Sequence, residues 1–443
     1  MRARLLYNLV LLLCIIGMRP LHAQTNMLQA GPMVGYADMK EVMLWVQTRT
    51  EAEVKIMYWD KTAPKIKYNT TSVKTSKSLA FTAHLLADKV QPGRQYGYEL
   101  YINNKKVSRP YTLQFQTQEL WQFRKDAPNF RFVIGSCNYI NEPEADRPGE
   151  AYGGDYQIFS SILTQKPDFM LWLGDNTYLR EPDWNTRTGI FHRYTHTRSV
   201  PEMQPLLGSV HQYAIWDDHD YGSNDADRSF SNKDITTETF KLFWANPNYN
   251  LTGQGGITGT FTWNDAQFFL LDDRYFRSPN NSTKNKVLLG KTQLDWLLDA
   301  LTSSKANFKF VCIGGQVLNT VNAFENYSTF PAEKQQLLTK ITAAKIPGVI
   351  FLDGDRHHTE LSRITRRGTY PLYDLTVSPL TASPAKGDGK ANKNQLPGTF
   401  YNQRNFAVLN VSGSTAERLL TITVYSSDAE PIWQQQIRAN DLK

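Results

Sequence analysis

The sequence predicts an α/β protein in which a layered α/β domain follows a small β-sandwich. Up to about Gln118, short runs such as "EVKIMYWD" alternate between apolar and polar residues, which is typical of strands with one exposed face. From Phe130 the apolar runs become continuous, as in "FRFVIGSC", which is typical of strands covered on both faces. We therefore expect a sandwich domain at residues 24–120 and an α/β domain at residues 130–443, joined by "LWQFRKDAPN".

The first segment carries short alternating runs that are separated by turn signals such as "QPGRQ" and "INNKK". Strands at this spacing are typical of an immunoglobulin-like or fibronectin-like sandwich. The strands expected there lie at residues 41–48, 53–60, 79–85, 96–103 and 111–117.

The second segment alternates apolar runs with stretches of helical periodicity, as layered α/β domains do. The expected strands lie at residues 130–137, 167–175, 213–220, 266–274, 308–315 and 347–355. Helices are expected at residues 154–165, 291–304 and 331–344, and a closing pair of strands at residues 404–413 and 418–427.

The N-terminus is predicted to be a cleaved secretory signal peptide at residues 1–23. Arg2 and Arg4 precede the apolar run "LLYNLVLLLCIIG", and "LHA" ends in Ala23, a small residue suited to cleavage. The apolar run is short for a membrane span, and no later segment has the length to cross a bilayer. We therefore expect a secreted or periplasmic protein with no membrane span.

Charge gives no sign of a nucleic-acid partner. The 443 residues include 49 Lys and Arg against 42 Asp and Glu, a formal charge of +7. The predicted leader contains three arginines and no acidic residue, so its removal lowers the charge to +4. No basic cluster of the kind that nucleic-acid-binding surfaces carry is present. The oligomeric state is not predicted.

Polar residues end almost every apolar run of the α/β domain. They are Cys137, Asp175, Asp217–Asp218, Asp272–Asp273, Asp353 and Asp355. In open α/β sheets, ligands bind at the carboxyl ends of the strands. Several carboxylates at one sheet edge are costly unless cations neutralise them. The placement of these residues therefore predicts a metal site.

Three motifs carry this prediction. In "WLGDNTY", Gly174 permits a tight turn that aims Asp175 out of the strand end, although a helix N-cap is an alternative role for this aspartate. In "WDDHDYGSN", the histidine lies among carboxylates, which suits a metal ligand or an acid/base group. In "FLDGDRHHTE", Asp355 and His357 are two residues apart and would point the same way in extended backbone. A solvated acidic turn is the alternative for the last two motifs.

Arginines follow the acids in "LLDDRYFR". Arg274 and Arg277 have two open interpretations, a surface ion-pair patch with the neighbouring aspartates or a contact to an anionic substrate.

Cys137 lies at a strand end and has four open roles: a core residue, half of a disulfide, a nucleophile or a metal ligand. After removal of the leader, Cys312 is the other cysteine, and an oxidising compartment would permit a bond between the two. No serine nucleophile elbow, phosphate-cradling P-loop or dinucleotide fingerprint is present in the sequence.

Taken in order, these motifs resemble those of PhoD-type alkaline phosphatases in the metallophosphoesterase superfamily. The residues that carry the resemblance are Gly135-Ser136-Cys137, Gly174-Asp175 with Tyr178, Trp216-Asp217-Asp218-His219-Asp220 with Asn224, and Gly354-Asp355-Arg356-His357. "LGKTQLDWLLDAL" and the N-terminal sandwich are also similar to segments of that family. The resemblance implies a four-layer αββα fold with a multinuclear metal centre.

The resemblance also implies the ligands and the metals. It implies Fe3+ held by Cys137, Asp175, Tyr178 and His357. It implies Ca2+ held by Asp218, Asn224 and Asp355, with Asp175 as a bridge and other divalent metals left open. Anionic thiolate, phenolate and carboxylate donors suit a trivalent ion, and oxygen donors suit calcium. His219, near the leaving group, and Asp217 are the expected catalytic residues.

The expected function is that of an exported metal-dependent phosphoesterase that hydrolyses phosphate monoesters, diesters or both. One alternative is a non-catalytic protein at the cell surface or on a polymer, with structural calcium in its acidic clusters. Another is a hydrolase of a different ester on the same scaffold, because fold does not fix function.

Overall fold

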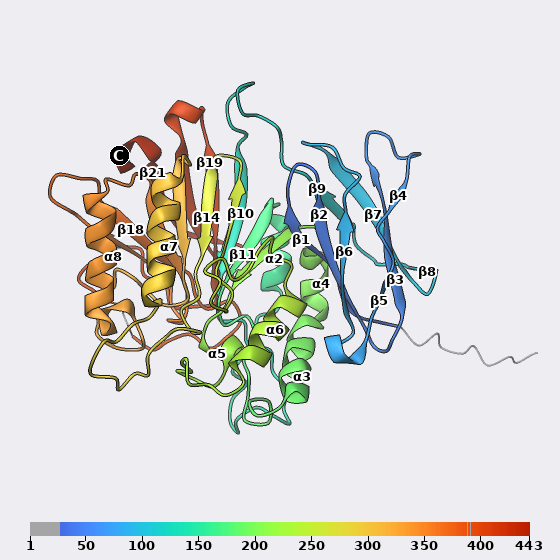
Figure 1. Cartoon of the computed structure of the whole chain (residues 1–443), viewed down its shortest axis with the longest axis horizontal. Coiled ribbons are helices and arrows are strands. Elements are labelled where there is room, and N and C mark those ends of the chain that lie inside the picture. The colour runs from blue at the N-terminus through green and yellow to red at the C-terminus, as the bar shows by residue number, and fades with distance from the viewer. Residues whose placement is uncertain (1–26, 388, 390) are drawn as a thin grey trace, which may run out of the picture.

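Two β-sheets packed face to face form the centre of the α/β part of the molecule (Figure 1). The computed structural model describes residues 27–387, 389 and 391–443, so the predicted signal peptide lies outside the described residues. The first sheet has nine strands in the order β21-β20-β19-β10-β11-β12-β1-β2-β6. Its strands are β1 (Leu28–Ala37), β2 (Val42–Thr48), β6 (Thr82–Ala87), β10 (Phe130–Gly135), β11 (Phe169–Leu173), β12 (His211–Ile215), β19 (Asn405–Ser412), β20 (Leu419–Ser426) and β21 (Pro431–Arg438).

The second sheet has six strands in the order β13-β14-β15-β16-β18-β17. They are β13 (Gly259–Trp263), β14 (Ala266–Leu270), β15 (Phe308–Cys312), β16 (Val349–Asp353), β17 (Glu360–Ile364) and β18 (Leu372–Thr376). The strands β14, β15, β16 and β18 are parallel to one another, as are β10, β11 and β12 in the first sheet. Their carboxyl ends therefore meet at common sheet edges.

Alternation along the strands divides the buried side chains between two layers. Phe132 of β10 points toward the second sheet, where its ring meets that of Phe310 at 5.4 Å. Val133, the next residue, belongs instead to the cluster formed with the helices on the outer face. The ring of Tyr213 stacks on that of Phe261 across the two sheets at 3.8 Å. An aromatic layer thus fills the space between the sheets.

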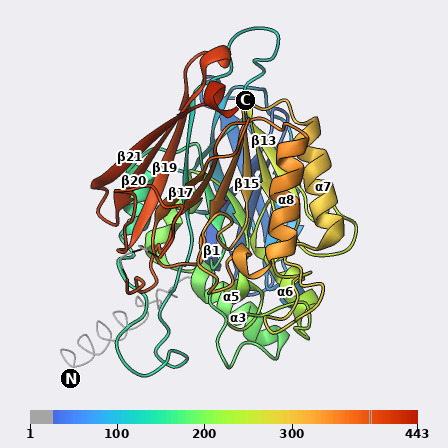
Figure 2. The same cartoon turned by 90° about the vertical axis from the view of Figure 1, so that its left-hand side faces the viewer.

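Helices cover the outer face of each sheet and complete four layers (Figures 1 and 2). Those on the second sheet are α7 (Gly290–Ser303) and α8 (Pro331–Ala343). Those packed on the first sheet are α2 (Ile158–Thr164), α3 (Arg187–Arg198), α4 (Gln204–Leu207) and α6 (Lys233–Phe243), and the short α5 (Asp218–Tyr221) follows β12. The predicted αββα arrangement is confirmed. Helices α3, α4, α5 and α6, and strands β1, β13, β17, β18 and β21 of these two sheets, were not predicted. The expected strand at residues 213–220 is wrong at its end, where α5 begins at Asp218.

The N-terminal segment forms a β-sandwich, as predicted. An antiparallel sheet faces β1, β2 and β6, and the rings of Tyr96 and Phe115 stack at 5.0 Å in the core of the sandwich. Its strands are β3 (Glu53–Asp60), β4 (Tyr68–Asn69), β5 (Val73–Lys74), β7 (Gln95–Ile102), β8 (Lys105–Val107) and β9 (Gln114–Gln116).

The sandwich and the α/β part are joined by a continuous sheet as well as by the linker, because β1, β2 and β6 belong to the nine-stranded sheet. Strand β1 runs parallel to β12, with Val34 opposite His211. The Nδ1 atom of His211 lies 2.7 Å from the carbonyl oxygen of Gly35, and the Tyr213 hydroxyl accepts a hydrogen bond from the Ala37 backbone at 3.1 Å. The domain boundary near residue 120 stays a prediction, and these hydrogen bonds join residues on its two sides.

Candidate metal centre

The ends of four strands place polar side chains around one pocket. Cys137 follows β10, Asp175 follows β11 and Asp218 follows β12, and the register Gly135–Trp172–Ala214 sets these three strand ends at one level. Asp355 and His357 arrive from β16 of the second sheet. The pocket has a volume of about 400 Å³. Its lining residues include Tyr152, Asp175, Asp218, His219, Asn224, Asp225, Asp355, Arg356 and His357.

Left-handed backbone aims several of these side chains. The φ angles of Cys137, Asp175, Asp355 and His357 are 58°, 51°, 63° and 52°. Non-glycine residues adopt this region rarely, and such conformations concentrate at functional sites. Left-handed residues turn the chain away from the strand direction, and three of these four, Asp175, Asp355 and His357, line the pocket.

Two glycines let the strand ends approach one another. Gly174 has φ +95°, and a Cβ atom there would lie 2.7 Å from the Cβ of Asp217. A Cβ atom on Gly354 would lie 2.3 Å from the Oγ of Ser136, which belongs to the other sheet. A larger residue at Gly174 would push the ends of β11 and β12 apart, and one at Gly354 would push the two sheets apart.

One group of side chains combines a thiol, a carboxylate and an imidazole. Ligand atoms of Cys137, Asp175 and His357 all lie within 4.8 Å of one another, and the Cys137 sulfur is 3.8 Å from Asp175 Oδ2. The Tyr178 hydroxyl lies 3.2 Å from His357 Nε2. On its other side, His357 Nδ1 lies 2.6 Å from the carbonyl oxygen of Ser383, a contact that orients metal-binding histidines. These donor types suit iron.

Two further groups extend the row of possible ligands. Asp175, Asp218 and His219 form the second group, and Asp218, Asp225 and Glu325 form the third, each with ligand atoms within 4.8 Å of one another. Asp175 and Asp218 each belong to two groups. A carboxylate in that position can bridge neighbouring cations, because it has two oxygens to offer.

Burial makes this site unfavourable for charge unless cations are bound. Desolvation raises the pKa of the Cys137 thiol to about 11, and the nearby charge of Asp355 acts in the same direction. Desolvation also raises the pKa of Asp175 well above its usual range and that of Asp355 to about 6. It lowers the pKa of His357. Cations would reverse these shifts, because they stabilise thiolate and carboxylate forms.

Unpaired buried atoms also fit bound cations or substrate. Within the described residues, Asp355 Oδ2 and His219 Nδ1 are buried without a hydrogen-bond partner, although Asp355 Oδ2 lies 3.6 Å from Arg356 Nη1. Buried polar atoms are normally paired, so orphaned atoms beside a carboxylate cluster indicate a missing ligand. The donor set and these orphans therefore fit the metals that the sequence implies.

The four polar residues of "DDHD" take different places. Asp218 and His219 line the pocket, and the His219 ring stacks on that of Tyr178 at 4.4 Å. Asp220 is buried and accepts hydrogen bonds from the backbone N–H groups of Asn176 and Thr177 at 3.2 and 3.1 Å. Asp217 is buried and forms an ion pair with Arg274. Asp217 is absent from the pocket lining, and its catalytic role stays a prediction.

Arg274 and Arg277 do not form the surface patch that the sequence left open, and that interpretation is wrong. Both are fully buried, and both form ion pairs with Glu325. Arg274 turns inward because the buried carboxylate of Asp217 needs a cation. Neither arginine lines the pocket, so the structure gives no support for their predicted contact with substrate.

Cys137 and Cys312 are both buried and both free thiols. The disulfide alternative is therefore wrong. Cys312 lies at the end of β15 with its sulfur 3.7 Å from the carbonyl oxygen of Phe310, away from the pocket lining.

Sequence analysis gave no role to eight of the residues that line the pocket. They are Tyr152, Asp225, Asn280, Lys286, Phe324, Glu325, Thr329 and Arg356. Asp225 follows the "WDDHDYGSN" motif directly, so adjacency was an available signal. Arg356 lies inside a motif whose neighbours were chosen. Tyr152 and Glu325 lie in irregular loops, where no periodicity marks them.

Comparison with known proteins agrees with this geometry. Residues 132–416 match the family described as PhoD-like phosphatase, and residues 25–120 match a family described as a domain of unknown function (DUF7800). Alkaline phosphatase D of Bacillus subtilis (strain 168) is 21% identical over 337 residues, which cover 65% of this chain and 55% of that protein. The chain thus spans little more than half the length of that relative.

Two solved structures share the fold. A structure described as PhoD gives a TM-score of 0.75 at 16% identity, covering 94% of this chain and 92% of the other. Purple acid phosphatase PPD1 from yellow lupin (Lupinus luteus) seeds gives 0.67 at 12% identity, covering 92% of this chain and 74% of the other. The four layers and the ligand-bearing strand ends define a protein of the metallophosphoesterase class. Because the family match covers well over half of its length, this chain belongs to the PhoD-like phosphatase family.

Proposed function

We propose that this protein is an exported metal-dependent phosphoesterase that hydrolyses phosphate monoesters, diesters or both. The observation that carries the proposal is the row of three ligand groups joined by Asp175 and Asp218. Membership of the PhoD-like phosphatase family supports a phosphate ester as the substrate. Export rests on the predicted signal peptide at residues 1–23. Within the described residues, no helix has the length and hydrophobicity needed to span a membrane.

The proposed cofactors are Fe3+ and Ca2+. Iron would be held by Cys137, Asp175, Tyr178 and His357, and calcium by Asp175, Asp218, Asn224 and Asp355. Asn224 is exposed on the pocket wall, where its side-chain oxygen is available. When bound, such cations supply Lewis acidity, activate water and neutralise phosphoryl oxygens.

The protein's own residues supply position and a proton. Asp175 is held in place by the backbone N–H of His219, which donates to its Oδ1 at 3.2 Å. The His219 ring is fixed by stacking on Tyr178, and its Nδ1 is free of protein partners within the described residues. His219 is the proposed proton donor to the leaving oxygen, and donation of this kind contributes about 10²- to 10⁴-fold to rate.

Metal removal tests the proposal. Treatment of the purified protein with EDTA and a ferric chelator is expected to abolish hydrolysis of p-nitrophenyl phosphate or bis(p-nitrophenyl) phosphate. Adding back calcium and iron together is expected to restore it. Stable calcium binding without hydrolysis of either compound would support the non-catalytic alternative. Hydrolysis that survives complete metal removal would exclude the proposed mechanism.

A further inference from the structure

We propose that Arg356 and Phe324 form a substrate-recognition pair at the mouth of the pocket, an inference that rests on the proposed function. Arg356 binds a non-bridging oxygen of the phosphoryl group, and Phe324 packs against an aromatic group esterified to it. The preferred substrates are then phosphate esters of aromatic alcohols. Both residues line the pocket.

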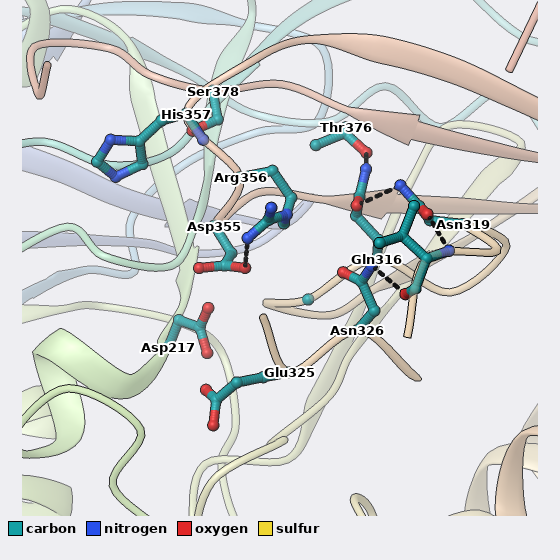
Figure 3. Close-up of polar contacts among 12 residues, drawn as sticks. Asp217, Gln316, Asn319, Glu325, Asn326, Asp355, Arg356, His357, Thr376 and Ser378 are labelled. Carbon is teal, nitrogen blue, oxygen red and sulfur yellow. Dashed lines mark hydrogen bonds and ion pairs between the residues drawn. The ribbon is translucent and has the colours of Figure 1, made fainter. Parts of the chain in front are cut away.

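The Arg356 guanidinium has hydrogen-bonding capacity to spare. Its closest acidic partner is Asp355, with 3.6 Å between Nη1 and Oδ2, as the dashed line in Figure 3 shows. Its Nε atom is buried and has no hydrogen-bond partner within the described residues. A guanidinium carries five N–H donors in a planar fork that matches phosphate oxygens. Asp355 is itself a proposed metal ligand, so its charge is shared with a cation when the site is loaded.

Arg274 and Arg277 are already engaged in buried ion pairs and do not reach the pocket. Arg274 pairs with Asp217 and Glu325, and Arg277 pairs with Glu325. Of these three arginines, Arg356 alone lines the pocket. Arg356 is therefore better placed for the contact with an anionic substrate that the sequence left open for Arg274 and Arg277.

Phe324 is held outward rather than left exposed by chance. Its side chain is 67% exposed, and its ring lies 4.1 Å from the Arg356 guanidinium carbon. Phe324 and Glu325 are consecutive non-glycine residues with left-handed backbone, φ 50° and 66°. This strained turn sends the Glu325 carboxylate inward to the buried arginines and the Phe324 ring outward to the pocket mouth.

A buried polar network holds the base of this loop. Gln316 Nε2 donates to Thr376 Oγ1 at 2.8 Å and Asn319 Nδ2 donates to Gln316 Oε1 at 2.8 Å, as the dashed lines in Figure 3 show. Asn326 Nδ2 donates to the carbonyl oxygen of Val321 at 2.9 Å. The loop is therefore anchored on both sides of Phe324, which gives the ring a fixed place beside Arg356.

Calorimetry with non-hydrolysable phosphonates tests the pair in the metal-loaded protein. The wild type is expected to bind phenylphosphonate about 3- to 10-fold more tightly than methylphosphonate, the range for one aromatic contact. Phe324→Leu is expected to reduce this preference to within about twofold. Arg356→Lys keeps the positive charge but loses the planar fork of N–H donors. It is expected to lower the affinity for both phosphonates by about 10-fold or more.

The matched control is Arg109→Lys. Arg109 stacks over the Tyr111 ring at 5.0 Å in the N-terminal segment, outside the pocket lining, so its replacement should change neither affinity. Unchanged phosphonate affinity in Arg356→Lys, or an intact phenyl preference in Phe324→Leu, would overturn the recognition pair. The expected binding pattern without hydrolysis of any phosphate ester would instead refute only the proposed enzymatic function.

Discussion

Replacing Cys137 by serine is expected to remove bound iron and the visible charge-transfer colour of the protein, and to lower kcat/KM by at least about 100-fold. The size of the decrease in kcat/KM follows because a catalytic cation supplies several kcal/mol of transition-state stabilisation. A difference of about 1.4 kcal/mol corresponds to a tenfold change in rate. Folding should change little, because serine can keep the 3.0 Å contact with the Ser378 hydroxyl. Iron content by mass spectrometry, the visible spectrum and steady-state kinetics measure the three effects.

Cys312→Ser provides the matched control. It removes an equally buried free thiol at the end of β15, away from the pocket lining. It should retain iron, colour and activity. Equal loss of iron in both variants would show a general effect of disturbing the core, and full iron content in Cys137→Ser would exclude this thiol as a ligand.

Replacing Arg274 by methionine is expected to destabilise the fold by about 3–5 kcal/mol, the usual effect of removing one partner from a buried ion pair. Arg274 is 1% exposed and forms ion pairs with Asp217 and Glu325. Its loss leaves two carboxylates buried without this cation, one just after β12 and one in the Phe324 loop. Equilibrium urea unfolding, followed by tryptophan fluorescence, measures the change in unfolding free energy.

Arg187→Met is the corresponding control at the surface. Arg187 pairs with Glu238 at 2.6 Å, but both side chains are more than 40% exposed. A pair of this kind contributes about 0–1 kcal/mol. If Arg274→Met lowers the free energy of unfolding by no more than Arg187→Met does, the buried ion pairs around Glu325 do not stabilise the fold at this site.

The layered fold and the strand ends could be predicted from sequence because their signals are local. A continuous apolar run that stops at Cys137 or Asp175 marks both a buried strand and the point where its side chains leave the sheet. Parallel strands then bring such ends together without further information. The structure places Cys137, Asp175, Tyr178, Asp218, Asn224, Asp355 and His357 around one pocket or against its wall.

The rest depends on contacts between residues far apart in the chain. Nothing local shows that Arg274 faces Asp217, 57 positions earlier, so the sequence could not tell a buried ion pair from a surface one. The left-handed turn at Phe324 and Glu325 has no glycine to mark it. The pairing of β1 with β12 likewise joins segments about 180 residues apart, beyond the reach of periodicity.

The measurement that tests the central claim most directly is an anomalous difference map collected at the iron absorption edge from crystals of the purified protein. We expect a peak within bonding distance of the Cys137 sulfur, Asp175, Tyr178 and His357. Residual electron density for a second cation is expected beside Asp175 and Asp218. A protein that hydrolyses phosphate esters but shows no metal between these side chains would contradict the account.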